Sequence, residues 1–225
     1  MKILKLLVLL SFWATSTFAG VNLKNGNFYI TYTDIVVPGG GHDLIIERTY
    51  NSRSPDKGWF GYGWGSDYET YLTVSADGSV VVHENGSGAL TRFTPKQAVN
   101  AQAAANKIVD AMRKKTSVSK QVAASLVKKL KNDAELRQAY AKRFNVKAQL
   151  SVGTELFSNV RGMQKIIRTK NGFTRKHNDG MEHQFNVDGK LTKVKDKNGY
   201  VVDLTYKGKV LVSLKDSMAK QVFFD

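Results

Sequence analysis

The four histidines are the first residues to test for chemistry, because imidazole is both a metal ligand and an acid–base group. They are His42, His83, His177 and His183. His177 and His183 are six residues apart with Glu182 adjacent, which differs from the i, i+4 pair of a helical zinc site. A zinc site requires three or four protein ligands. We therefore expect no metal site and no cofactor.

Carboxylates offer a second route to catalysis, since a pair of them can hydrolyse a glycosidic bond. The candidates are Asp34, Asp43, Glu47 and Asp67, but their spacing selects no particular pair. Aspartate in hairpin turns also has an ordinary structural role. The sequence contains no glycine-rich phosphate loop and no Gly-x-Ser-x-Gly elbow. We expect a protein that is not an enzyme.

Cysteine content and charge narrow the class of protein further. The chain has no cysteine, so it has no disulfide framework, no thiol nucleophile and no thiolate metal site. Its formal net charge is +15. A charge of this size favours anionic partners such as envelope polysaccharide. Because no nucleic-acid-binding motif accompanies the charge, we expect no specific nucleic-acid partner.

The first 19 residues have the order of a secretory signal peptide. A basic segment at residues 1–5 precedes an apolar run at residues 6–12 and a small-residue cleavage site at residues 17–19. The apolar run is too short to span a bilayer. We expect cleavage after Ala19, a mature chain without a membrane span, and a location in the periplasm, at the cell surface or outside the cell.

Residues 20–93 predict an N-terminal β domain, because apolar and polar residues alternate between glycine-containing turns. Within it, residues 58–65 interleave four aromatic rings with four glycines. One interpretation is a buried structural corner in which rings pack over bare backbone. The other is an exposed aromatic platform for sugar rings, formed by Trp59, Tyr62 and Trp64.

Residues 94–148 interrupt the strand pattern and predict a helical insert of three helices. Apolar residues recur at helical spacing, and the expected inward positions include Val122 in the second helix and Ala139 in the third. The expected N-terminal signals are Thr94 followed by Pro95, then Ser117 or Ser119, then Asn132 or Asp133.

The insert carries a formal charge of +10, which is most of the charge of the mature chain. One interpretation is the solvated outer face of an amphipathic helical cap. The functional interpretation is a polyanion-binding surface. Its candidate residues are Lys128, Lys129, Lys131, Arg137, Lys142 and Arg143.

Residues 149–225 predict β-hairpin repeats. From residue 178 onward, Asn/Asp-Gly turns separate short apolar alternations with a period of 19 to 20 residues. Hairpins laid side by side leave strand edges that recruit further strands. The repeat series is expected to be incomplete, with self-association through the C-terminal edge strand.

Several of these segments resemble the opening domain of RHS/YD-repeat proteins. The similarity lies in residues 25–54, 58–69 and 77–93, with Arg48-Thr-Tyr-Asn-Ser-Arg53 and Gly61-Tyr-Gly-Trp64 in the same order. Residues 172–225 resemble the first YD-type repeats. The resemblance implies a spiral of antiparallel hairpins forming part of a hollow β-shell, as in secreted bacterial toxins and cell-surface proteins. Toxin members enclose a C-terminal effector, for which this chain has no segment.

The resemblance and the missing catalytic patterns lead to one expected function and one alternative. We expect an exported structural or interaction protein, the N-terminal portion of an RHS/YD-repeat shell or cell-surface protein, or a fragment of a polymorphic toxin. Its partner would be a downstream shell or effector chain. The alternative is a module that binds envelope polysaccharide or another polyanion through the basic insert.

Overall fold

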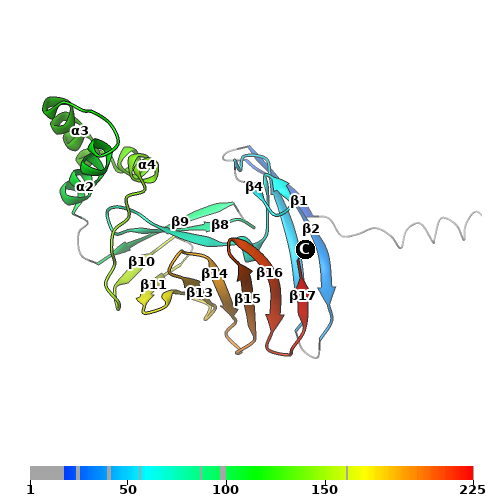
Figure 1. The fold of residues 1–225 in the computed structure, drawn as a ribbon. Coiled ribbons are helices and arrows are strands. Elements are labelled where there is room, and N and C mark those ends of the chain that lie inside the picture. Colours follow the sequence, from blue (N-terminus) through cyan, green and yellow to red (C-terminus); the bar gives the residue numbers. More distant parts are fainter. Residues whose placement is uncertain are drawn as a thin grey trace, which may run out of the picture. The chain divides into compact units, whose positions relative to one another are not determined.

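The computed structural model describes residues 18–23, 26–39, 42–55, 57–86, 88–96, 100–160 and 162–224. Most of the predicted signal peptide lies outside these residues. The described chain is mainly antiparallel β-structure with three α-helices (Figure 1), which confirms the mainly β part of the prediction. In these ranges no helix combines the length and the apolar character that crossing a membrane requires. The chain divides into two compact units, residues 1–67 with 85–88, and residues 68–84 with 89–225.

The first unit contains a four-stranded antiparallel sheet in the order β1-β2-β3-β6 and a two-stranded ribbon of β4 and β5. β2 is the longest strand, and a bulge between Thr33 and Ile35 shifts its register against β3. The predicted cleavage site after Ala19 falls within β1. The strands are β1 (Phe18–Asn22), β2 (Asn27–Val37), β3 (Leu44–Asn51), β4 (Lys57–Gly58), β5 (Gly61–Tyr62) and β6 (Trp64–Gly65).

The second unit contains an eleven-stranded sheet in which strands adjacent in the chain are adjacent in the sheet, from β7 to β17. A short 3-10 helix, η1 (Asp67–Glu69), precedes it in the chain. Neighbouring strands are antiparallel throughout (Figure 1). The strands are β7 (Tyr71–Val74), β8 (Val80–Glu84), β9 (Ala89–Pro95), β10 (Glu155–Ser158), β11 (Gln164–Thr169), β12 (Gly172–Lys176), β13 (Glu182–Asn186), β14 (Leu191–Lys195), β15 (Val201–Lys207), β16 (Val210–Asp216) and β17 (Gln221–Phe223).

Five hairpin turns of this sheet share one backbone geometry. In each, the N–H of the first residue donates to the carbonyl of the fifth, and the N–H of the fourth donates to the carbonyl of the first. The fourth residue has a φ between 65° and 90°, a conformation that favours glycine because a Cβ is strained there. The turns are residues 75–79, 177–181, 186–190, 196–200 and 216–220.

Side chains reinforce three of these turns in the same way. The Oδ1 atom of Asn186 accepts the N–H groups of Asp188 and Lys190 at 3.0 and 2.9 Å. Asp196 and Asp216 accept the corresponding two N–H groups at 2.8 to 2.9 Å. An Asx side chain that satisfies two turn amides explains why Asn and Asp recur in the repeat.

β7, the first strand of the sheet, also contacts the turn between β13 and β14 through its backbone. The N–H of Leu72 in β7 donates to the carbonyl of Gly189 at 2.8 Å, and Tyr71 forms an isolated β-bridge with Lys190. The sheet therefore folds back on itself and buries one face, here called the Phe93 face. Side chains on this face with at most 2 % exposure include Leu72, Val82, Phe93, Leu156, Ile166 and Leu191.

The three helices, α2 (Ala101–Arg113), α3 (Lys120–Asn132) and α4 (Ala134–Phe144), occupy the connection between β9 and β10, which pair directly. The helices pack mainly on one another around Ile108 and Leu130, both 0 % exposed. Ser119 and Asp133 cap α3 and α4, as predicted.

Three details of the predicted insert are wrong. Thr94 and Pro95 belong to β9 rather than to a helix, and α2 begins later because Asn100 caps it. Val122 is 57 % exposed and Ala139 is also exposed. Helical periodicity placed both near the apolar stripe, but the actual packing direction leaves them at its margin.

We predict that Gly189→Ala destabilises the protein much more than Gly199→Ala. Both glycines occupy the fourth position of the shared turn, with φ of 87° and 90°. A Cβ at Gly189 would lie 2.0 Å from the Leu72 carbonyl oxygen, whereas one at Gly199 would meet nothing within 4 Å. Backbone strain costs both variants about 1–2 kcal/mol, and Gly189→Ala should lose at least about 2 kcal/mol more from the displaced contact. Urea unfolding measures both, and equal losses would contradict the fold-back contact.

Candidate functional site

The Phe93 face contains a buried polar cluster centred on Arg175 of β12. Arg175 is 2 % exposed and its Nη2 atom lies 2.6 Å from Oε1 of Glu84 in β8. Its Nε and Nη2 atoms both donate to Oε1 of Gln164, at 3.0 and 2.7 Å. The guanidinium also lies 5.6 Å from the centre of the Phe93 ring. This ion pair joins segments 91 residues apart in the chain and therefore fixes the curvature of the sheet.

His177 and His183 lie beside this cluster, with ring centres 4.7 Å apart in an edge-to-face arrangement. The expectation that these two histidines do not form a metal site stays a prediction. Within the described residues, His, Asp and Glu side chains do not gather in the groups of three that could hold a metal ion. Burial, followed by the charge of Arg175, lowers the pKa of His177 to about 4. Burial, then His177 and Arg175, lowers the pKa of His183 to about 3.

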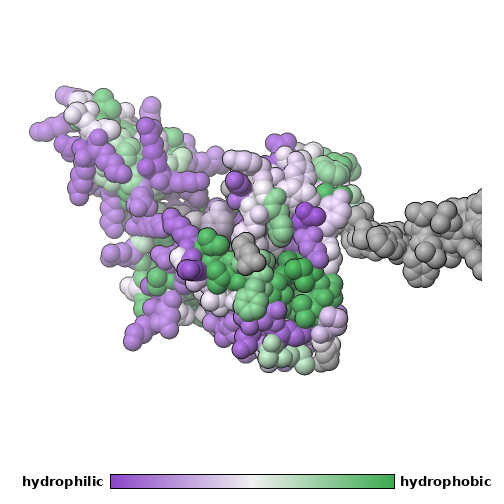
Figure 2. All heavy atoms as spheres, turned by 45° about the vertical axis from the view of Figure 1, so that its right-hand side comes forward, coloured by the Kyte–Doolittle hydropathy of each residue, from purple (hydrophilic) through white to green (hydrophobic). Residues whose placement is uncertain are grey.

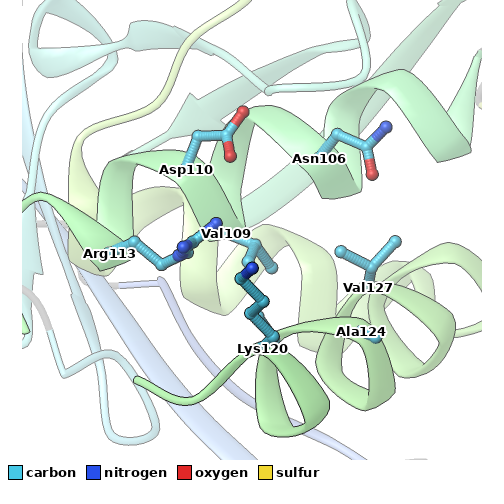
Figure 3. A pocket seen from close by; sticks show the side chains of 8 residues that line it. Asn106, Val109, Asp110, Arg113, Lys120, Ala124 and Val127 are labelled. Atoms are coloured by element: carbon cyan, nitrogen blue, oxygen red, sulfur yellow. The ribbon is translucent and has the colours of Figure 1, made fainter. Parts of the chain in front are cut away.

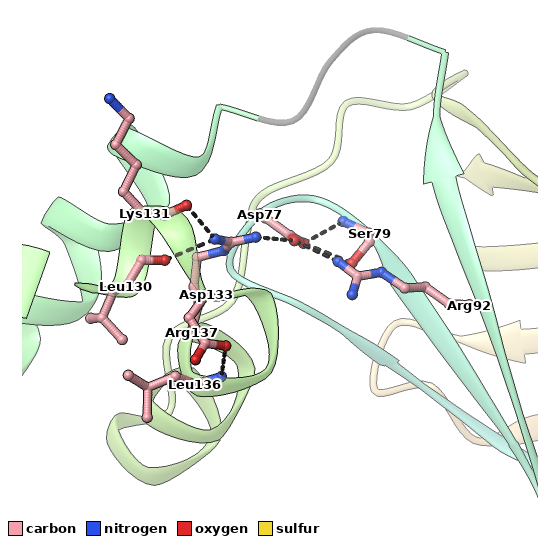
Figure 4. Close-up of polar contacts among 8 residues, drawn as sticks. All are labelled: Asp77, Ser79, Arg92, Leu130, Lys131, Asp133, Leu136 and Arg137. Atoms are coloured by element: carbon pink, nitrogen blue, oxygen red, sulfur yellow. Dashed lines mark hydrogen bonds and ion pairs between the residues drawn. The ribbon is translucent and has the colours of Figure 1, made fainter. Parts of the chain in front are cut away.

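Asp77 joins the helices to the sheet (Figure 4). Its Oδ1 atom accepts the N–H and hydroxyl of Ser79 at 3.0 and 2.7 Å. Its Oδ2 atom lies 2.7 Å from Arg92 Nη2 and 3.5 Å from Arg137 Nη2. Burial alone would raise the pKa of Asp77, but the Ser79 hydrogen bonds and the two arginines outweigh it and lower the pKa below 3.8.

Arg137 is therefore a structural residue, although it belongs to the predicted polyanion-binding set. It is 7 % exposed and its Nη1 atom donates to the carbonyls of Leu130 and Lys131 at 2.8 and 3.1 Å. These carbonyls belong to the C-terminal turn of α3, where cationic groups are favoured. One guanidinium thus connects α3, α4 and the turn at Asp77.

The other five predicted polyanion-binding residues lie on the helix surface. All are exposed, and none forms an ion pair with a residue in the described ranges. Figure 2 shows hydrophilic side chains over most of the outward surface of the helical segment, at the upper left. These residues are Lys128, Lys129 and Lys131 on α3, and Lys142 and Arg143 on α4.

A groove of about 370 Å³ lies between α2 and α3. Figure 3 shows Arg113 and Lys120 directed toward the same space, with Val109 and Val127 beside it and the carboxylate of Asp110 directed away. The groove combines two cations with one anion in its wall. All of the residues that line the groove belong to α2 or α3.

A second cavity of about 290 Å³ lies between α4 and the sheet. On the sheet side, Tyr71 of β7 and His83 of β8 form a directly opposed cross-strand pair, and their rings are stacked at 4.3 Å with a 6° interplanar angle. The Oγ1 atom of Thr73 lies 3.2 Å from His83 Nε2. The remaining lining residues are Val74, Ser75, Gln138, Ala141, Lys142, Asn145, Val146 and Lys147.

The predicted aromatic platform lies in the first unit and is only partly exposed. Trp64 packs against Tyr50 at 5.3 Å, and the Arg48 guanidinium lies 4.9 Å from its ring centre. Trp59 is 38 % and Tyr62 is 73 % exposed. The packing of Trp64 therefore favours the interpretation as a structural corner. Tyr62 is the most accessible of the three rings.

Three of the four candidate carboxylates of the first unit bind groups other than a second carboxylate. Asp34 pairs with Arg48 at 3.0 Å. Glu47 accepts the hydroxyl of Thr33, and Asp43 accepts the N–H of Gly39, each at 3.0 Å. Each of these three carboxylates thus has a local structural partner.

Sequence reasoning missed Arg175, Asp77 and the Tyr71/His83 pair. Arg175 could have been found, because it lies two residues after the buried Phe173 and a strand places such residues on one face. Asp77 looks like any turn aspartate in the sequence. The approach of α4 to Tyr71 and His83 depends on tertiary packing and leaves no sequence signal.

We predict that Arg137→Ala lowers the free energy of unfolding by about 3 kcal/mol, because it leaves Asp77 and two helix-end carbonyls without their buried donor. The matched control is Arg143→Ala, an exposed arginine on the same helix, which should change the stability by less than about 0.5 kcal/mol. Urea unfolding of the two variants gives the comparison. Similar effects would mean that Arg137 contributes no more than a surface arginine.

We also predict that stability falls as the pH is lowered from 6.5 toward 4. The pKa values of His177 and His183 in the fold, about 4 and about 3, lie below the ordinary 6.5. The unfolded chain therefore binds more protons in this window, so the stabilisation is complete above pH 6.5 and is lost as the pH falls through the folded values. His183→Gln should flatten the dependence measured by urea unfolding. A dependence unchanged by His183→Gln would contradict the prediction.

Comparison with protein families finds a match in the N-terminal part of the chain. Residues 19–93 match the model of DUF6531, described as a domain of unknown function. No curated protein matches the chain. The matched range covers about a third of the sequence and nearly coincides with the expected N-terminal β domain at 20–93. In the structure its strands are shared by the two units, since β1 to β6 lie in the first and β7 to β9 begin the long sheet of the second.

Proposed function

We propose that this chain is an exported structural and interaction module, the N-terminal portion of an RHS/YD-repeat shell or cell-surface protein. The observation that carries the proposal is the eleven-stranded sheet with strands in chain order and one turn geometry used five times. The DUF6531 match supports it, because this domain is often found in RHS/YD-repeat proteins. A fragment of a polymorphic toxin would have the same architecture.

The sheet has the architecture of a repeat protein, which grows by adding copies of one hairpin unit. Each hairpin adds two strands and one turn without changing the strands before it, as in other repeat proteins. The fold-back contact between Leu72 and Gly189 favours a spiral over a flat sheet. The Arg175–Glu84 ion pair favours the same curvature from within.

The edge of β17 is the surface at which a partner would extend such a sheet. Within the described residues β17 pairs with β16 alone. The N–H of Phe224 donates to the Val212 carbonyl of β16, and N–H directions alternate along a strand, so the N–H of Phe223 faces away from β16. We propose that this edge adds a strand, either from a second copy or from a downstream shell or effector chain.

A second candidate function is binding of an envelope polysaccharide or another polyanion. The observation that favours it is the set of five exposed cations on α3 and α4 without an ion-pair partner in the described residues. Clustered cations on one element attract polyanions at a distance. The two functions are compatible, because the insert and the β17 edge are separate parts of the chain.

We predict that Phe223→Pro raises the monomer fraction at high protein concentration. Proline removes the outward N–H of β17 and leaves the bond from Phe224 to Val212 in place. Phe223→Ser is the control, since it removes the 71 % exposed ring but keeps the N–H. Light scattering across a concentration series measures the fraction, with circular dichroism to show that the sheet is retained. A rise with Phe223→Ser alone would indicate hydrophobic contact, and a wild-type chain that is monomeric throughout would refute self-pairing.

A further inference from the structure

The cavity between α4 and the sheet differs in charge from the rest of the insert surface. Eleven residues line it, and none of them is acidic. Lys142 and Lys147 are both exposed at its margin, and neither has an ion-pair partner among the described residues. The groove between α2 and α3 differs, because its lining includes the acidic residue Asp110, although the carboxylate of Asp110 is directed away from the groove. The cavity at α4 is therefore the better site for a small anion.

Contacts on two sides hold the walls of this cavity in place. The Arg137–Asp77 pair fixes α4 to the turn at residues 75–79. The N–H of Ala148 donates to the carbonyl of Ser75 at 3.2 Å, which fixes the segment after α4. Between these points Asn145 ends the helix with a φ of 54° and turns the chain back toward the sheet. The fold thus sets the backbone positions of the two lysines relative to the two rings.

The lining residues offer three kinds of contact. Lys142 and Lys147 provide positive charge for a carboxylate or phosphate. The amides of Gln138 and Asn145, with the hydroxyl of Thr73, donate and accept hydrogen bonds as sugar hydroxyls require. Apolar surface comes from Tyr71, the ring stacked on it, and the side chains of Ala141 and Val146.

The size of the cavity restricts the ligand. Its volume of about 290 Å³ is at the lower end of the range of about 300–1,000 Å³ for small-molecule sites. A single ring with its substituents suits this volume better than a chain of several rings. Because Lys142 and Lys147 at its margin are exposed, a ring bound there would be able to belong to a longer polymer.

We infer that this cavity binds one acidic sugar residue, a hexuronate, with its carboxylate at Lys142 and Lys147 and its ring beside Tyr71 and His83. This gives the basic insert a defined ligand class in place of general attraction for polyanions. The inference does not depend on the structural function proposed above. It would hold if the β17 edge recruited no strand, so the two proposals fail separately.

Titration of the full chain with D-glucuronate, followed by amide chemical shifts in NMR, tests the inference at physiological salt. We expect shifts at the amides lining the cavity and a Kd on the order of 1 mM, as for a ligand of this size. D-Glucose should bind at least about tenfold more weakly, because it lacks the carboxylate. Benzoate, which has the carboxylate but no hydroxyls, should also bind more weakly than D-glucuronate.

The decisive comparison uses two double variants with the same change in charge. Lys142→Gln with Lys147→Gln should weaken D-glucuronate binding about tenfold or more, whereas Lys128→Gln with Lys129→Gln on α3 should weaken it by less than about twofold. Equal weakening by the two double variants would show diffuse attraction and overturn the inference. Absence of shifts at the cavity amides, or tighter binding of benzoate than of D-glucuronate, would overturn it as well.

Discussion

A residue with positive φ at the fourth position of a five-residue turn is the constraint on which the long sheet depends. The turn recurs five times, with glycine at 78, 180, 189 and 199 and Ala219 in the last copy. A hairpin whose loop length and turn geometry are fixed has a fixed register, and a slip of one residue would move every apolar side chain to the opposite face. The turn at residues 186–190, for example, sets the face of the sheet on which Leu191 lies, and Leu191 is 0 % exposed.

The turn at Asp77 has a second role that its copies lack. Its Oδ1 atom stabilises the turn through Ser79, and its Oδ2 atom pairs with Arg92 and Arg137. At Asp216, by contrast, the second oxygen accepts the hydroxyl of Tyr200 at 2.9 Å within the hairpin series. Asp77 is the third residue of its turn and Asp216 is the first residue of its own, so two different positions of the repeated turn provide these contacts. Asp77 anchors the helical insert, whereas Asp216 binds Tyr200 of the preceding turn.

The parts of the fold that depend on local pattern could be predicted from the sequence. Hairpins follow from Asn/Asp-Gly turns, and the caps Ser119 and Asp133 follow from the need to satisfy helix-end amides. The start of α2 could not be placed, because Thr94-Pro95 has the chemistry of a cap although β10 recruits both residues into the sheet. The cavity at α4 could not be predicted either, since Tyr71 and Lys147 are 76 positions apart and meet only through tertiary packing.

The buried cation of the sheet and the exposed cations of α3 and α4 differ in their surroundings. In the sheet interior the cation Arg175 is matched by Glu84, as a buried charge must be. Among the residues that the structure describes, the exposed cations of α3 and α4 have no such partners, although a solvated helix could carry acidic residues in between at no structural cost. β9 and β10 pair directly with each other. Substitutions on the surface of the insert would therefore leave this pairing in place. In the site that we infer, the insert provides the two lysines, while Tyr71 and His83 of the sheet provide the rings.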